Sequence, residues 1–94
     1  MNNDWVRTKL EEFLATCEEH RRLRDRIPPG RYWDEGLMRP ITNMVERQLP
    51  TVRRIIETLD ASLLSDDFGV SGVYGGLGST ETTTRKALAV LDAA

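Results

Sequence analysis

The sequence has only one cysteine, Cys17, among its 94 residues. A single cysteine excludes an intramolecular disulfide, and a reducing cytoplasm is the compartment that fits this cysteine content best. The N-terminus lacks a basic start followed by an apolar run, and no stretch approaches the ~20 apolar residues that a membrane span needs. We therefore expect a cytoplasmic protein that is neither exported nor inserted into a membrane.

An excess of charge of either sign is also missing, because the formal net charge is only −2. Proteins dedicated to nucleic acid take much of their affinity from an excess of lysine and arginine, so the composition argues against nucleic acid as a partner. Apolar residues make up 39% and charged residues 30% of the chain. These shares are typical of one compact globular domain, and we expect it to span residues 1–94.

The first segment predicts a long helix from about Asn3 to Ile27, with Asn3 or Asp4 as its N-cap. Its apolar side chains recur at steps of three and four and form one buried stripe, namely Val6, Leu10, Phe13, Leu14 and Cys17. Charged side chains occupy the opposite face, namely Glu11, Glu18, Arg22 and Asp25. Further along, the stripe turns polar at His20, Arg21 and Arg24, so either the helix leaves the core there or these groups meet a partner.

Prolines and a glycine divide the chain after this helix. Pro28-Pro29-Gly30 ends the first helix, and Asp34 is a good N-cap for a second, with Trp33 and Met38 placed to form a hydrophobic staple. Pro40 and Pro50 then predict a short turn followed by two helical pieces, with a kink at Pro50. The strongest amphipathic pattern in the chain follows Pro50, at Val52, Ile55, Ile56, Leu59 and Leu63.

Residues 65–79 are rich in glycine and predict a loop or a flexible tether before the last helix. Ser79 or Thr80 can cap that helix, and Glu81 in its first turn suits the helix dipole. We therefore predict an all-α fold, a small bundle of three helical segments with a Pro-kinked middle helix and a Gly-rich loop before the last helix. The predicted core is Val6, Leu10, Phe13, Leu14, Cys17, Trp33, Val45, Val52, Ile55, Ile56, Leu59, Leu63, Leu88 and Leu91.

Three small motifs could carry chemistry. The run from Gly75 to Thr80 is a glycine-rich turn that opens a helix and could cradle phosphate, yet no strand precedes it and no lysine reaches the phosphate position. Cys17 and His20 share a helix face, but two ligands are too few for a structural zinc site, so a buried cysteine beside a hydrogen-bonded histidine is the favoured interpretation. Asp66-Asp67 is typical of a polar turn. We predict no catalytic, cofactor or metal site.

The densest charge cluster holds four arginines, Arg21, Arg22, Arg24 and Arg26. Together with Arg53 and Arg54, expected nearby across the bundle, Arg21 and Arg24 could contact an anionic partner. The alternative is a solvated helix end, in which Glu18 pairs with Arg22 and Arg21 with Asp25 at ~0.2–0.5 kcal/mol each.

Trp5 and Leu23 share a side of the first helix that is separate from its main stripe. One small domain would thus have two apolar surfaces to cover, so we expect this side to be an interface. Two-fold association is the commonest solution, and Arg22 or Arg26 could then reach Glu12 or Glu19 of the partner.

A broader pattern consists of Trp5, Arg7, Leu10 and Phe13, then Arg24-Asp25, Tyr32-Trp33, Leu49-Pro50-Thr51-Val52 and Ile55-Ile56, and finally Arg85, Ala87-Leu88 and Leu91. It resembles the helical N-terminal region of uncharacterised proteins from high-GC Gram-positive bacteria and their phages, some of them similar to abortive-infection or conflict-system components. The resemblance implies an accessory or recognition domain and brings no active-site residue with it.

The function expected from these patterns is a non-enzymatic protein-interaction or oligomerisation module, acting in phage-host conflict or on a host protein. Its partner would be a second copy or a host protein. Two alternatives stay open, which are nucleic-acid binding through the cluster from Arg21 to Arg26 and nucleotide binding through the loop from Gly75 to Thr80.

Overall fold

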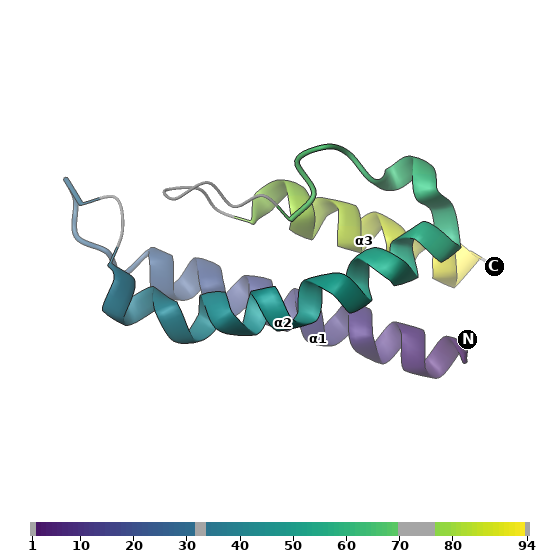
Figure 1. Cartoon of the computed structure of the whole chain (residues 1–94), viewed down its shortest axis with the longest axis horizontal. Helices are drawn as coiled ribbons and strands as arrows, with labels where there is room; N and C mark the ends of the chain where they lie inside the picture. Colours follow the sequence, from purple (N-terminus) through teal and green to yellow (C-terminus); the bar gives the residue numbers. More distant parts are fainter. Residues whose placement is uncertain (1, 32–33, 70–76, 94) are drawn as a thin grey trace.

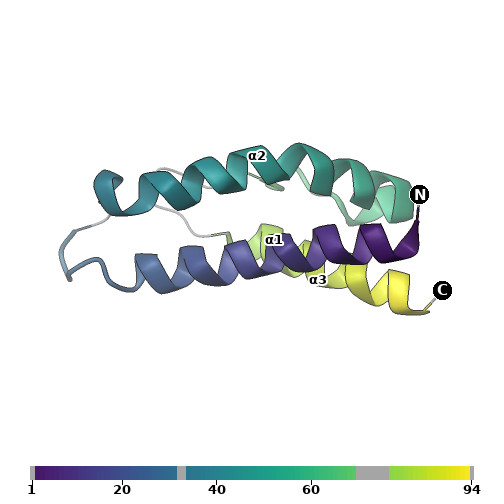
Figure 2. The ribbon, with the colours of Figure 1, turned by 90° about the horizontal axis from the view of Figure 1, so that it is seen from below.

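The computed structural model describes residues 2–31, 34–69 and 77–93, and within these ranges the fold is all-α. Three helices follow one another, α1 (Asn3–Arg24), α2 (Glu35–Asp60) and α3 (Gly78–Ala93), with one 3-10 turn, η1 (Ala61–Leu63), directly after α2. The bundle is elongated, with extents of 45 × 23 × 19 Å. Figure 1 shows α1 and α2 as the long antiparallel pair and the shorter α3 on one side of it. Figure 2 views the bundle from below, with α1 and α2 next to each other.

Helix α1 begins at Asn3 and has Asn2 as its N-cap, so the cap lies one residue before the first predicted cap, Asn3. The side-chain oxygen of Asn2 accepts hydrogen bonds from the amides of Asp4, at 2.7 Å, and of Trp5, at 3.3 Å. The helix ends at Arg24 and not at Ile27. The amide of Ile27 bonds to the carbonyl of Arg24, three residues back, because Pro28 disfavours helical dihedrals in the residue before it.

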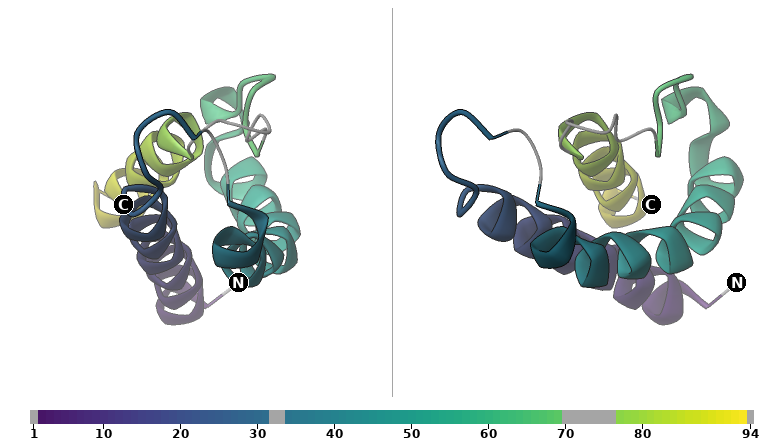
Figure 3. Two further views of the ribbon diagram at one scale, coloured as in Figure 1. Left: turned by 90° about the vertical axis from the view of Figure 1, so that its left-hand side faces the viewer. Right: turned by 60° about the vertical axis from the view of Figure 1, so that its left-hand side comes forward.

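Helix α2 begins where the sequence predicted, since the carboxylate of Asp34 accepts from the amide of Leu37 at 3.1 Å. The predicted division into a turn and two pieces was wrong, because α2 continues through both Pro40 and Pro50. Each proline removes one helical hydrogen bond, yet both lie on the exposed side, while buried side chains before and after them hold the helix to the core. Figure 3 shows that α2 curves along its length, and the kink at Pro50 stays a prediction.

Ten predicted core residues are buried, and they are Val6, Leu10, Phe13, Leu14, Cys17, Val45, Val52, Ile55, Ile56 and Leu91. Three others, Leu59, Leu63 and Leu88, are only partly buried and pack against that core. Trp33, with its predicted staple, lies outside the described residues. The structure adds five buried apolar side chains that the predicted core omitted, namely Met38, Ile41, Phe68, Leu77 and Ala87.

Part of the connection between η1 and α3 packs against the core. Phe68 is buried, and Gly69 after it has a φ of 81°, a left-handed conformation that favours glycine. Helix α3 starts at Gly78, so neither Ser79 nor Thr80 is its cap. Instead, the hydroxyl of Thr80 accepts from the amide of Gly69 at 2.8 Å and ties the two ends of the connection together. Residues 70–76 of the predicted Gly-rich loop lie outside the described ranges.

Candidate functional site

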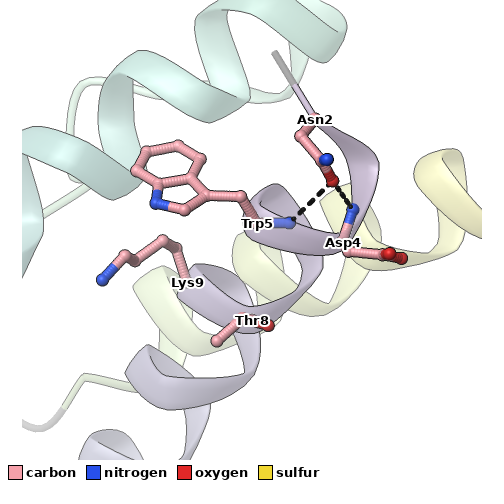
Figure 4. A pocket seen from close by; sticks show the side chains of 5 residues that line it. All are labelled: Asn2, Asp4, Trp5, Thr8 and Lys9. Carbon is pink, nitrogen blue, oxygen red and sulfur yellow. Dashed lines mark hydrogen bonds between the residues drawn. The ribbon is translucent and has the colours of Figure 1, made fainter.

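Trp5 is the most exposed large hydrophobic side chain of the described residues. It lies in the first turn of α1, is 44% exposed, and extends from α1 toward α2 (Figure 4). The ammonium group of Lys9, one turn later, lies 5.8 Å from the centre of the indole ring. This geometry allows a cation–π attraction of ~0.5–1 kcal/mol, which stabilises the indole ring in its exposed position.

Met44 is the second exposed large hydrophobic side chain of the described residues, and 41% of its surface is exposed. Its sulfur accepts a hydrogen bond of 3.6 Å from the hydroxyl of Thr16, which also donates to the carbonyl of Glu12 at 3.1 Å. The contact fixes where α2 crosses α1, about three turns beyond Trp5. Trp5 and Met44 thus mark two points along the same side of the α1 and α2 pair.

A groove lies between α1 and α2 beside Trp5. We call it the α1–α2 groove and define it by Trp5, Lys9 and Glu12 on α1 and Arg47, Gln48 and Thr51 on α2, with the exposed Met44 further along α2 in contact with the buried Thr16. Steps of three and four residues place each set on one face of its helix. Part of the groove is a pocket of about 320 Å³, and a second pocket of about 320 Å³ lies on the other side of Trp5, against Pro50, Arg54 and Ile55.

The middle of the groove is polar. The ammonium of Lys9 and the carboxylate of Glu12 form an ion pair at 3.6 Å, and both side chains are well exposed. The amide oxygen of Gln48 is buried in the same region and has no hydrogen-bond partner among the described residues. Such an acceptor costs folding free energy, because the group has lost water and gained nothing in return.

Leu23 does not join Trp5 in a compact patch. The two residues are 18 apart, which is five helical turns and ~27 Å along one line of α1. Leu23 is half-buried. Arg22 donates to Glu19 of the same helix at 2.9 and 2.5 Å, so a bond from Arg22 to Glu19 of another chain would first have to break this one.

Two arginines of the cluster, Arg21 and Arg22, form ion pairs within the chain. In place of the predicted pairs of Glu18 with Arg22 and Arg21 with Asp25, Arg22 pairs with Glu19 and Arg21 donates to Glu81 of α3. Arg85 adds a second bond to Glu81, at 2.9 Å. The polar end of the α1 stripe therefore meets a partner inside its own bundle.

Arg54 lies beside Trp5 at the start of α1, far from Arg21 and Arg24 at its end, and Arg53 binds the connection between α2 and α3, so the expected cluster of these arginines does not form. Arg53 donates to the carbonyl of Phe68 at 3.1 Å, and its guanidinium lies 5.5 Å from the Phe68 ring. Arg54 lines the pocket beside Trp5, at the start of α1. The antiparallel course of α1 and α2 explains the separation, because the end of α2 returns to the beginning of α1.

A pocket of about 230 Å³ lies beneath the pair of Arg21 and Glu81, and Cys17 and His20 line it. Burial, aided by the nearby Glu81 carboxylate, raises the pKa of Cys17 to about 12, so its thiol is protonated and a poor nucleophile. Burial, and then the charge of Arg24, lowers the pKa of His20, which keeps the imidazole neutral. The sequence pattern did not identify Glu81 as the partner, because the polar run at the end of the stripe was equally consistent with a helix that leaves the core there.

The turn proposed for phosphate binding is only partly described, since Gly75 and Gly76 lie outside the described residues. Leu77 is buried, and Gly78 begins α3. The Ser79 hydroxyl donates to Asp67 at 3.4 Å. The first turn of α3 thus carries the buried Glu81 carboxylate in the region where a phosphate would have to lie.

Comparison with models of known protein families, with curated proteins and with solved structures found no match. The resemblance to conflict-system proteins therefore stays a prediction. In the described part of the chain, no helix is long and apolar enough to cross a membrane. Across residues 2–31, 34–69 and 77–93, no three His, Cys, Asp or Glu side chains come together in a way that could hold a metal ion.

Proposed function

We propose that this protein is a non-enzymatic self-association module that uses the α1–α2 groove. The observation that carries the proposal is Trp5, a tryptophan that extends over the groove while 44% of its surface stays exposed. Tryptophan is among the residue types most enriched at the energetic centres of protein interfaces. Met44, further along α2, adds an unbranched, polarisable side chain that adapts to a partner surface.

The core does not need Trp5. Val6, Leu10 and Phe13 supply the buried face of α1, and Trp5 belongs to a different face of the helix. A large aromatic side chain that serves neither the core nor a capping contact is free to serve an interface. Figure 3 shows α3 on one side of the α1 and α2 pair and no described helix on the other side.

The two alternative functions have less support. Nucleic-acid binding would draw on Arg21 and Arg22, which are paired with Glu81 and Glu19. Nucleotide binding would place phosphate in the first turn of α3, close to the Glu81 carboxylate. A setting in phage-host conflict, acting on itself or on a host protein, is consistent with an interaction module and rests on the sequence resemblance alone.

Sedimentation equilibrium tests the proposal. The wild-type chain is expected to show a concentration-dependent dimer, and the double variant Trp5→Ala and Met44→Ala is expected to shift it toward monomer with unchanged helix content. The matched control is Glu11→Ala and Glu57→Ala, which also changes one exposed side chain on each helix but leaves the groove intact. A wild-type chain that stays monomeric over the whole concentration range would overturn the proposal.

A further inference from the structure

The buried titratable side chains of the described residues gather at one place in the fold. They are Cys17 and His20 on α1 and Glu81 on α3, and all three line the pocket of about 230 Å³ between these two helices. The side chains that α2 buries are apolar. A change of pH therefore acts on the interior of the bundle at the point where α3 begins beside α1.

The first two turns of α3 are held mainly by polar contacts. The buried side chains of residues 78–85 are Thr80, Glu81, Thr83 and Thr84. The large apolar side chain that α3 buries, Leu91, comes two turns after Thr84. Segments with few buried apolar contacts open at a lower free-energy cost than the core, because apolar burial supplies most of the stabilisation. These two turns can therefore open locally while the rest of the bundle stays folded.

His20 is buried among charged groups. The titratable and charged side chains that line the pocket with it are Cys17, Arg21 and Arg24 on α1 and Glu81 on α3. The carboxylate of Glu81 already accepts hydrogen bonds from Arg21 and Arg85. Burial, and then the charge of Arg24, lowers the pKa of His20 from its ordinary value of 6.5. Opening restores that value, so the closed state is favoured above pH 6.5 and loses stability as the pH falls below it.

From this placement we propose that the first two turns of α3 are a pH-sensitive element, whose separation from α1 is favoured by protonation of His20 in mild acid, while α1 and α2 stay paired. The imidazolium would otherwise lie buried beside two guanidinium groups, and separation returns it to water. Glu81 acts in the same direction at lower pH, because protonation removes the charge that Arg21 and Arg85 share. This separation does not involve Trp5 and is independent of the proposed self-association.

Cys17 reports the separation directly. It is the only cysteine of the chain and lines the pocket, so a disulfide reagent that stays reactive in acid modifies it when α3 moves away from α1. The protection of the thiol is the labelling rate in denaturant divided by the rate in buffer at the same pH, a ratio that removes the pH dependence of the reagent. His20 is the only histidine, and ordinary carboxylates titrate at lower pH, so a change between about pH 7.5 and 5.5 reports His20.

The protection of Cys17 is expected to fall severalfold over this range, and by no more than about tenfold, which is the limit for one histidine with an ordinary pKa in the open state. In the variant His20→Gln it is expected to stay constant within about twofold. A wild-type chain whose protection does not change with pH would overturn the proposal, whether or not the variant folds. A folded variant that keeps the wild-type pH dependence would do the same.

A second reporter distinguishes local separation of α3 from opening of the whole bundle. It is Thr16→Cys in a chain that also carries Cys17→Ala, because Thr16 is buried next to Cys17 on α1 but contacts Met44 of α2. Both chains are labelled at the same low concentration and the same acid pH. If only α3 separates, the thiol at position 16 is expected to be at least about tenfold better protected than Cys17. Equal protection at the two positions would mean that all three helices open together and would overturn the proposal.

Discussion

Arg21 of α1 and Glu81 of α3 form an ion pair in which only the carboxylate is buried. The side chain of Glu81 is 8% exposed and that of Arg21 is 55% exposed. Arg85 binds the same carboxylate from one turn further along α3, at 2.9 Å. Two charge-assisted hydrogen bonds offset the cost of taking the carboxylate out of water. The pair also attaches α3 to α1 at the point where the apolar stripe of α1 ends.

Glu81→Gln is expected to destabilise the fold in a pH-dependent way. Burial raises the pKa of Glu81, but the hydrogen bonds and charges of Arg21 and Arg85 outweigh it and bring the pKa below its ordinary value of 4.5. A lowered folded-state pKa means that the stabilisation is fully present above pH 4.5 and disappears as the pH falls through the folded-state value. Urea unfolding at neutral pH and in acid should therefore show a difference between wild type and variant that shrinks in acid.

Asp92→Asn is the control for that experiment. Asp92 pairs with Arg7 at 2.5 Å, but both side chains are largely exposed, and such surface pairs contribute little. A Glu81→Gln chain as stable as the wild type at neutral pH would show that the buried pair does not hold α3.

Ile56→Ala and Leu59→Ala should differ clearly, although the sequence pattern treats them alike. Ile56 is fully buried, so its truncation is expected to cost ~2–5 kcal/mol in free energy of unfolding. Leu59 is only partly buried, so the same change should cost less, because part of its surface already meets water. Chemical denaturation of both variants measures this difference. Equal losses would mean that Leu59 is as deeply packed as Ile56.

Cys17 should be inert in the folded protein. Its side chain is buried and burial raises its pKa to about 12, so in mildly alkaline buffer almost no thiolate forms and little reagent reaches it. A chromogenic disulfide reagent is expected to react slowly in buffer and rapidly in denaturant. Fast reaction in buffer, at the rate of the unfolded chain, would contradict the burial of Cys17 beside Glu81 of α3.

Much of the fold could be predicted because the apolar periodicity of α1 and of the later part of α2 is regular. Eight of the ten predicted core residues that are buried lie in these two stretches. The pattern failed where tertiary packing overrides local rules. Proline ordinarily predicts a break, yet Pro40 and Pro50 are accommodated within α2 because buried residues on both sides hold the helix in place.

The candidate site was predictable only in part. Helical geometry separates Trp5 from the core stripe, so its exposure followed from the sequence. Its neighbours across the groove did not, because the pairing of α1 with α2 sets which residues of α2 face Trp5. For the same reason the sequence could not show that Glu81 lies against Arg21, 60 positions away, or that Met44 reaches Thr16.

The last prediction separates the contributions of Trp5 and Leu23 to association. If both were part of one interface, Trp5→Ala and Leu23→Ala would each weaken the dimer. Leu23 lies five helical turns from Trp5 along α1, outside the α1–α2 groove, whereas truncation of Trp5 removes the aromatic side chain at the groove itself.

Trp5→Ala is therefore expected to raise the dissociation constant about tenfold or more, as truncation of an aromatic interface anchor commonly does, whereas Leu23→Ala should leave it within about twofold. Because Leu23 is half-buried, its truncation should still lower the free energy of unfolding. Sedimentation equilibrium gives the first quantity and urea unfolding the second, so the two roles can be distinguished in the same pair of variants. Dissociation of the Leu23→Ala chain with its helix content intact would place Leu23 inside the interface, and the α1–α2 groove would then not be the whole interface.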